Sequence, residues 1–222
     1  MRFVLLHSPV VGPSTWRWVA EALRTAGNEV VVPDLVAAAT AGDPVRWAET
    51  AVRSAGSGDA ILVGHSGAGA LLPLVAAGLA TRPRLTVFVD AGLPPCHGSF
   101  TAGGEFLGNL RELSMDGLLP RWSRWWEPGV LESLIPDDDR RAAVEAELPE
   151  IPLRFYESTI EAPQGWCSRS GAYVLLSEGY QADADTAARL GWPVVTRLGQ
   201  HLDIVGDAEA IAAILLEISA CP

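Results

Sequence analysis

The chain is short of charge, of basic residues and of long apolar runs, and each shortage excludes a class of protein. Charged residues make up only 19% of the 222 residues while 49% are hydrophobic, which excludes intrinsic disorder and predicts a large core. Acidic residues outnumber basic ones by 27 to 16, for a formal net charge of −11. An acidic surface argues against nucleic acid and against an anionic membrane as partners, because both require Lys and Arg patches.

Cysteine is also scarce, and no cofactor motif is present. The three cysteines Cys96, Cys167 and Cys221 are scattered, with no disulfide framework or metal-binding pair among them, so we expect reduced thiols in a reducing compartment. The first apolar run, residues 3–6, is too short for a signal sequence or a membrane span, and we expect a cytoplasmic protein. Glycine-rich nucleotide loops and HExxH are absent, so we expect no cofactor and no metal.

Short apolar runs alternate with helical patterns along the chain. The runs are continuous, as in strands that are buried on both faces; they cover residues 3–6, 30–32, 60–63, 85–89, 172–176 and 194–196. Between two of them, Asp43 and Pro44 form a typical helix start. The alternation predicts an α/β fold, with a mostly parallel six-stranded sheet and helices on both of its faces.

Residues 93–171 break this alternation. They contain helical patterns at 105–113, 118–126, 138–147 and 153–160, separated by prolines. Because a connection of this length needs structure of its own, we predict a helical cap inserted after the fourth strand, over the carboxyl ends of the strands. Residues 1–92 and 172–222 then form the core, and the cap is not an independent domain.

One segment carries the pattern of a catalytic nucleophile. Residues 60–69 read as a strand, a sharp turn with Ser66 at its tip, and a helix. Gly64 and Ala68 are small, as the close approach of strand and helix requires in a nucleophile elbow. The N–H of Gly67 would then face a developing oxyanion. Alternatively, Ser66 only caps the helix.

With this elbow, the sequence resembles the α/β-hydrolase superfamily over nearly its whole length. The matching features are residues 3–7, Trp16, residues 30–35, the Gly-His-Ser-Gly of 64–67 and His201 in a loop after the last strand. It looks most similar to the small group that includes plant methylesterases and hydroxynitrile lyases. The resemblance implies that Ser66 is the nucleophile and His201 the general base.

The acid of the triad has several candidates. The usual position of the family falls at Gly179, with Glu178 one residue away. Asp90, at the end of the fourth strand, is preferred because some members take the acid from there; its alternative explanation is a local turn. Asp183 is better explained as a helix cap.

The loop after the first strand departs from the family pattern. Its second oxyanion donor would be the N–H of Pro9, which has none. Either Val10 N–H donates instead, or the Ser8 hydroxyl does, or the reaction forms no oxyanion.

Aromatic residues of the cap are candidates for a substrate pocket. Trp122, Trp125 and Trp126 have helical spacing, and Trp166, His97 and Pro9 could also contact a ligand; the tryptophans could equally fix the cap to the core. The leading hypothesis is a serine hydrolase of a small or medium apolar ester, thioester or lactone. The alternatives are a lyase, cyclase or isomerase that acts on a hydrophobic metabolite through proton transfer by Ser66 and His201, and a non-catalytic binding protein. No motif specifies an oligomeric state.

Overall fold

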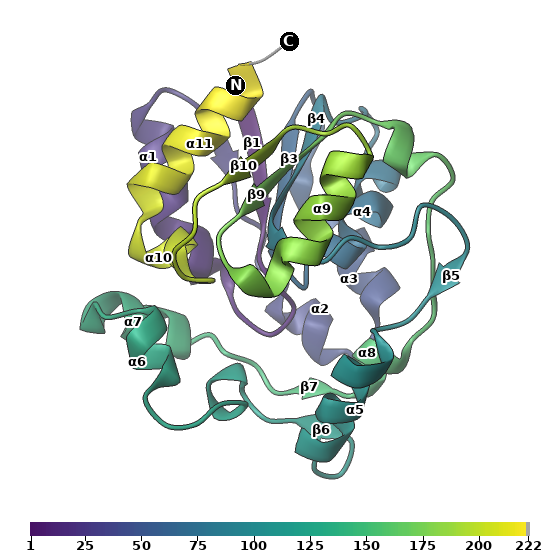
Figure 1. Cartoon of the computed structure of the whole chain (residues 1–222), viewed down its shortest axis with the longest axis vertical. Helices are drawn as coiled ribbons and strands as arrows, with labels where there is room; N and C mark the ends of the chain where they lie inside the picture. The colour runs from purple at the N-terminus through teal and green to yellow at the C-terminus, as the bar shows by residue number, and fades with distance from the viewer. Residues whose placement is uncertain (221–222) are drawn as a thin grey trace.

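A computed structural model describes residues 1–220, and a six-stranded parallel sheet forms its centre (Figure 1). The strand order is β10-β9-β4-β3-β1-β2, and every neighbouring pair is parallel. The strands are β1 (Arg2–Leu6), β2 (Glu29–Val31), β3 (Ile61–Ser66), β4 (Leu85–Ala91), β9 (Gly171–Leu175) and β10 (Val194–Thr196). Each of the six apolar runs overlaps one of them, so the predicted α/β class and strand set are confirmed.

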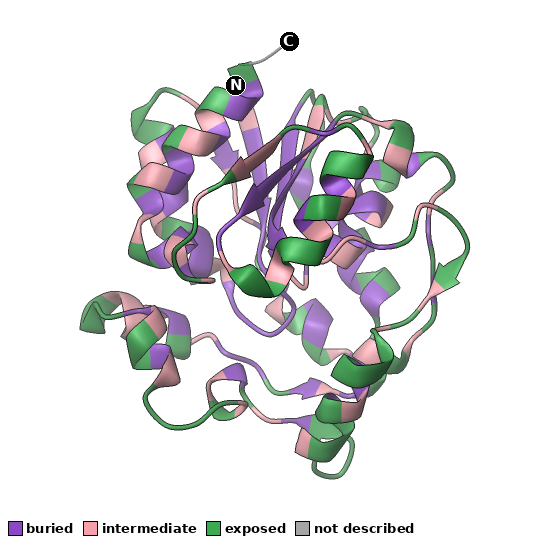
Figure 2. Cartoon of the chain, viewed as in Figure 1, coloured by how far each residue is buried: buried purple, intermediate pink, exposed green. Residues whose placement is uncertain are grey.

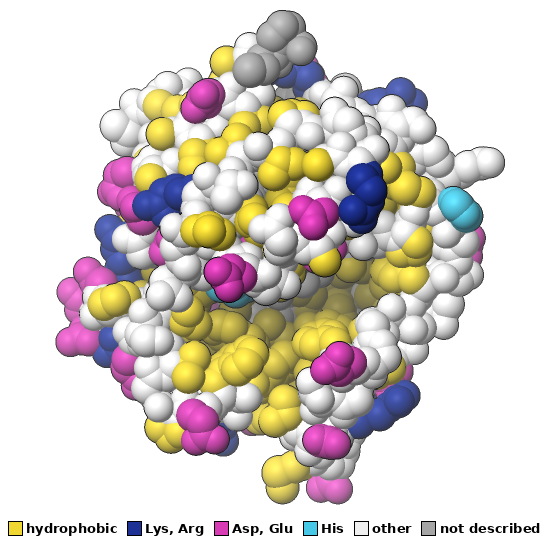
Figure 3. Space-filling model, viewed as in Figure 1, with side chains coloured by type: hydrophobic (Ala, Val, Ile, Leu, Met, Phe, Trp, Pro, Cys, Tyr) yellow, Lys and Arg dark blue, Asp and Glu magenta, His cyan; other side chains and the backbone are white. Residues whose placement is uncertain are grey.

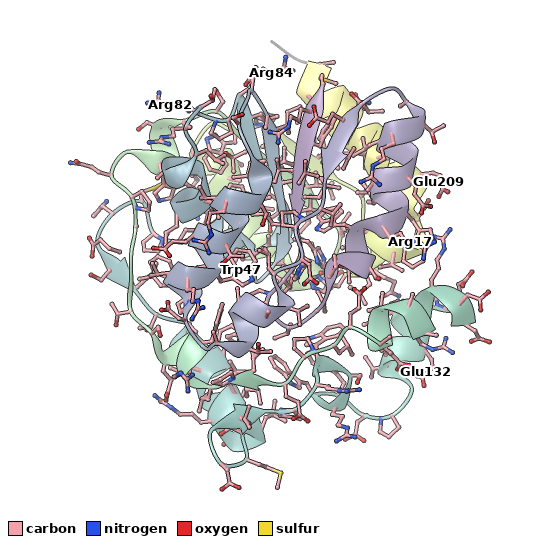
Figure 4. All side chains as sticks on the ribbon, turned by 180° about the vertical axis from the view of Figure 1, so that it is seen from behind. Arg17, Trp47, Arg82, Arg84, Glu132 and Glu209 are labelled. Carbon is pink, nitrogen blue, oxygen red and sulfur yellow. A yellow bond between two sulfur atoms is a disulfide. The ribbon has the colours of Figure 1, made fainter. Side chains whose placement is uncertain are left out.

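Helices cover the sheet from two sides. Helix α1 (Arg17–Thr25) packs against α11 (Ala208–Ala220), and α3 (Pro44–Ala55) packs against α4 (Leu72–Gly78). As predicted, Asp43 caps α3, accepting hydrogen bonds from the N–H groups of Val45 and Arg46. Trp47 points from α3 into the interior and is fully buried (Figure 4). The four central strands are largely buried, which explains their continuous apolar runs, whereas the edge strands β2 and β10 are partly exposed (Figure 2).

The cap lies across one end of the sheet, between β4 and β9 in sequence (Figure 1). It contains α5 (Gly104–Leu113), α6 (Val130–Leu134), α7 (Asp138–Glu145) and α8 (Arg154–Glu157). Two short antiparallel pairs join its parts: β5 (Ser99–Phe100) with β8 (Ile160–Glu161), and β6 (Leu118–Leu119) with β7 (Ile151–Pro152).

The helix predicted over residues 118–126 is wrong. The segment begins as strand β6 and then forms a single 3-10 turn, Trp122–Arg124. Pro120 accounts for the difference, because proline lacks the N–H of a helix interior and keeps the preceding residue out of the helical region. The helix predicted over 153–160 shrinks to the single turn of α8, after which the chain becomes β8.

The expectation of reduced cysteines is wrong for two of the three. Cys96 and Cys167 form a disulfide with a Cα–Cα distance of 5.4 Å and a sequence separation of 71. It joins the beginning of the cap to its end, so spacing alone could not reveal the pair. Because disulfides persist in oxidising compartments, the bond argues against the reducing, cytoplasmic setting that we expected. Cys221 lies outside the described residues. No helix within residues 1–220 has the length and apolar character needed to cross a membrane.

Polar contacts dock the cap against the core. Glu147 accepts two hydrogen bonds of 2.7 Å from Ser14, one from its N–H and one from its hydroxyl. The guanidinium of Arg140 lies 5.2 Å from the centre of the Trp18 ring, a cation–π distance, and donates to the backbone oxygen of Val205. These contacts fix one end of the cap to the side of the core that carries α1.

Candidate active site

Ser66 stands at a strained, sharp turn. It ends β3 with φ of 56°, in the left-handed region, and the pairing of β3 with β4 shifts register between His65 and Ser66. A Cβ on Gly69 would lie 2.4 Å from the backbone oxygen of Gly92, and one on Gly64 would lie 2.8 Å from the Leu72 side chain. These close approaches explain the small residues around Ser66, and the geometry is that of a nucleophile elbow.

His201 faces a fully buried carboxylate. Its Nδ1 lies 2.7 Å from Oδ2 of Asp90. The other oxygen, Oδ1, accepts hydrogen bonds of 2.9 Å from the backbone N–H groups of Leu176 and Ser177, and the Ser177 hydroxyl donates to Oδ2. These partners are distant in sequence, so Asp90 does not form the local turn that was its alternative explanation.

The Asp90 carboxyl remains ionised at neutral pH. Burial by itself raises its pKa, but the hydrogen bonds from His201 and Ser177 outweigh burial, and the net pKa is below the usual value. An ionised Asp90 stabilises the tautomer of His201 that carries its proton on Nδ1. The other ring nitrogen, Nε2, is then available to accept a proton.

The other two acid candidates do not reach His201. Glu178 is exposed and begins a 3-10 turn, Glu178–Tyr180. Asp183 does not cap its own helix, α9 (Gln181–Arg189), as the sequence suggested; its Oδ1 accepts a hydrogen bond of 2.7 Å from the N–H of Leu93. Burial raises the pKa of the Asp183 carboxyl. Among the described residues, Asp90 is therefore the carboxylate paired with His201.

Tyr180 is a site residue that the sequence analysis missed. Its ring stacks on the His201 imidazole, with centroids 5.2 Å apart and planes 8° from parallel. Its hydroxyl lies 3.3 Å from Ser66 Oγ, and burial raises its pKa to about 12, so the hydroxyl keeps its proton. No motif marks this tyrosine; its only signal is an aromatic residue in the loop where the family usually has its acid.

The loop after β1 forms a tight turn around Pro9. Val11 N–H donates to Ser8 O over 3.2 Å, which places Pro9 at the second turn position that proline favours. Pro9 packs beside Gly67 and is buried, while Val10 lines the cavity above the site. The Ser8 hydroxyl oxygen lies 3.0 Å from the point where a Cβ on Gly67 would stand. Ser8 and Gly67 are therefore brought together beside the nucleophile.

Two buried histidines support these loops. His65 Nε2 donates to the backbone oxygen of His201 over 2.9 Å, and burial lowers the pKa of His65 to about 3, so it is neutral. His7 accepts a hydrogen bond from Leu35 N–H at Nε2 and donates from Nδ1 to Ser8 O. Burial lowers the pKa of His7 as well. The two rings thus hold the His201 loop and the Ser8 turn in place.

A cavity of about 890 Å³ opens above Ser66 and His201, between core and cap. Figure 3 shows this hollow, lined largely by hydrophobic side chains. The cavity is lined by Trp122, Trp125 and Trp126, which agrees with their predicted role in a substrate pocket. They lie on or directly after a 3-10 turn, not on a helix. Among the described residues, no Lys or Arg lines the cavity.

Three residues assigned to the pocket do not line it. Trp166 packs against Phe88 and Trp192 and donates to the backbone oxygen of Pro95, so it fixes the end of the cap instead. His97 is exposed next to the disulfide, and Pro9 lies beneath the lining. The sequence could not show which way the side chains of these three residues face.

The parallel sheet, the elbow at Ser66 and the histidine after the last strand define an α/β-hydrolase fold. The structure is similar to that of an extracellular α/β-hydrolase from a Paenibacillus species (TM-score 0.76, 19% identity, 98% of each chain). It is also similar to polyneuridine aldehyde esterase (TM-score 0.77, 18% identity, 98% of each chain) and to a methylesterase from Arabidopsis (TM-score 0.73, 14% identity, 99% of each chain). No protein-family model and no curated protein matches the chain. At these identities, the likeness establishes the fold.

Proposed function

We propose that this chain is a serine hydrolase that cleaves a small or medium apolar ester, thioester or lactone. The observation that carries the proposal is the pairing of His201 with the buried Asp90, near a serine held at a strained elbow. Ser66 supplies an oxygen nucleophile, His201 a base, and Asp90 the charge that orients the base. The esterases of the same fold support this assignment.

The chemistry runs in two steps. Substrate binding draws Ser66 Oγ from Tyr180 toward Nε2 of His201, a contact that tightens only in the complex. Ser66 Oγ then attacks the carbonyl carbon, its proton passes to Nε2, and the leaving group departs with that proton. Water next attacks the acyl group and gives a proton to His201; as the acyl–oxygen bond breaks, His201 returns that proton to Ser66 Oγ and the acid product leaves.

The cavity defines the substrate class. Its walls are mainly aromatic and aliphatic, and none of its described lining residues is a Lys or Arg that could pair with a phosphate or a carboxylate. A volume of about 890 Å³ is large enough for a drug-sized molecule. We therefore expect an uncharged acyl or alkyl group to occupy the cavity.

A panel of p-nitrophenyl esters with acyl chains of two to twelve carbons tests the proposal. We expect turnover by the wild type, loss of turnover in Ser66→Ala and His201→Ala, and a medium-length optimum. If all esters are inert although the protein is folded, the proposal fails.

Pro9 favours a second candidate function, that of a non-hydrolytic enzyme. Pro9 removes the backbone donor that this fold ordinarily places opposite Gly67, so a reaction without a tetrahedral oxyanion fits as well. A lyase, cyclase or isomerase acting on a hydrophobic metabolite would use Ser66 and His201 for proton transfer. It would lose activity in His201→Ala, yet it would show no ester turnover.

A further inference from the structure

The cap places a tyrosine hydroxyl near Gly67, and the sequence did not indicate this residue. Tyr156 of α8 lines the cavity, and its hydroxyl oxygen lies 3.9 Å from the point where a Cβ on Gly67 would stand. Its ring is held edge-on by Phe106 and Phe155, with centroid distances of 5.6 and 5.5 Å. No hydrogen bond occupies this hydroxyl within residues 1–220, so its proton is free to point at a ligand.

The Tyr156 hydroxyl lies on the side of the site where Pro9 leaves a backbone hydrogen-bond donor missing. An oxyanion in this fold needs the N–H of the residue after the nucleophile, here Gly67, and one further donor. Proline cannot give that donor from the backbone. The Ser8 hydroxyl lies 3.0 Å and the Tyr156 hydroxyl 3.9 Å from the same point beside Gly67. Pro9 Cδ, which stands where an amide hydrogen would, lies 3.3 Å from that point, so the two side-chain hydroxyls lie close to the space that the missing N–H would face.

We propose that the Tyr156 hydroxyl, together with that of Ser8, replaces the missing backbone donor and makes Tyr156 a catalytic residue supplied by the cap. The inference rests on the proposed hydrolase function. As Ser66 Oγ bonds to the carbonyl carbon, the C=O π electrons move to oxygen, and Tyr156 donates a hydrogen bond to that oxygen without transferring its proton. When the C=O bond re-forms, the leaving group takes the proton held by His201.

Tyr156 suits this role better than Tyr180 does. Tyr180 is already engaged, since its hydroxyl contacts Ser66 Oγ and its ring covers His201. Burial raises the pKa of Tyr156, so the hydroxyl stays protonated and acts as a donor at any working pH. Because Tyr156 belongs to the cap, the oxyanion site is complete only while the cap is docked.

The test compares wild type with Tyr156→Phe, which keeps the ring and its packing, and with Ser8→Ala. Each is assayed for kcat and KM on the best ester and for binding of a matched pair of inhibitors. An alkyl trifluoromethyl ketone adds Ser66 to form an oxyanion, whereas the corresponding methyl ketone only fills the cavity. The thermal midpoint of each variant verifies that it is folded.

We expect Tyr156→Phe to lower kcat by about 10²–10³-fold with little change in KM, the cost typical of one lost oxyanion donor. Affinity for the trifluoromethyl ketone should fall by the same factor, while that for the methyl ketone stays constant. An unchanged kcat, or an equal loss for both ketones, overturns the inference, because the latter indicates a packing role. If the wild type turns over no ester and does not favour the trifluoromethyl ketone, the hydrolase function itself fails and the inference with it.

Discussion

Removing the disulfide between Cys96 and Cys167 should destabilise the protein mainly by freeing its unfolded chain. The bond closes a loop with a sequence separation of 71. In the chain-entropy model, a loop of that size is worth about 4 kcal/mol at 25 °C. The cap keeps its other attachments in the folded state, including the Ser14–Glu147 hydrogen bonds, so we expect the double variant Cys96→Ala/Cys167→Ala to remain folded.

The assay is urea unfolding followed by tryptophan fluorescence, with Cys221→Ser in every protein to prevent alternative pairing. We expect the double variant to lose about 4 kcal/mol of unfolding free energy and roughly 8–16 °C of thermal midpoint. Excess reductant should bring the disulfide-containing control down to the same values and leave the double variant unchanged. A loss below about 1 kcal/mol, or a control indifferent to reductant, would refute this account of the bond.

Three further predictions concern the triad, the half-buried Asp183 and the elbow. Asp90→Asn should keep the fold but lower kcat on esters by about 10⁴-fold, because His201 loses the charge that fixes its tautomer; a loss under tenfold would exclude Asp90 as the acid. Burial raises the folded-state pKa of Asp183, so ionisation of its carboxyl destabilises the fold as the pH rises through that pKa. Asp183→Asn should therefore increase the unfolding free energy at pH 7 relative to wild type, and this gain should disappear at pH 3. A gain that does not depend on pH would contradict the raised pKa of Asp183. Gly69→Ala should lower the unfolding free energy in urea by about 1–3 kcal/mol, because its Cβ would meet the backbone oxygen of Gly92. Gly108→Ala in α5 has open space around it and should cause no loss. Equal effects of the two substitutions would contradict the close approach of Gly69 to Gly92.

The sequence predicted the sheet well because its four central strands are largely buried on both faces. Such strands read as continuous apolar runs, and all six runs became strands. The elbow could be predicted equally well, since the close approach of strand and helix around Ser66 requires small residues at fixed spacing. Asp90 could be preferred over Glu178 because some members of the family that the sequence resembles take the acid from the end of this strand.

The backbone and the contacts of the cap could not be predicted, because its contacts join residues far apart in sequence and its segments are short and irregular. Helical spacing grouped Trp122, Trp125 and Trp126 correctly, but Pro120 limits the backbone there to a 3-10 turn. Tyr156 lies close to Gly67 only because the cap folds back over the core, and no periodicity in the sequence indicates that. The Cys96–Cys167 bond depends on the same return of the chain.

Covalent labelling with a fluorophosphonate tests whether His201 and Asp90 activate Ser66. After incubation, the adduct is located by peptide mass spectrometry in the wild type, in His201→Ala and in Asp90→Asn. The account predicts a single adduct on Ser66 in the wild type, with labelling abolished in His201→Ala and strongly slowed in Asp90→Asn. A folded wild type that remains unlabelled, or labelling of Ser66 at the same rate in all three proteins, would contradict it.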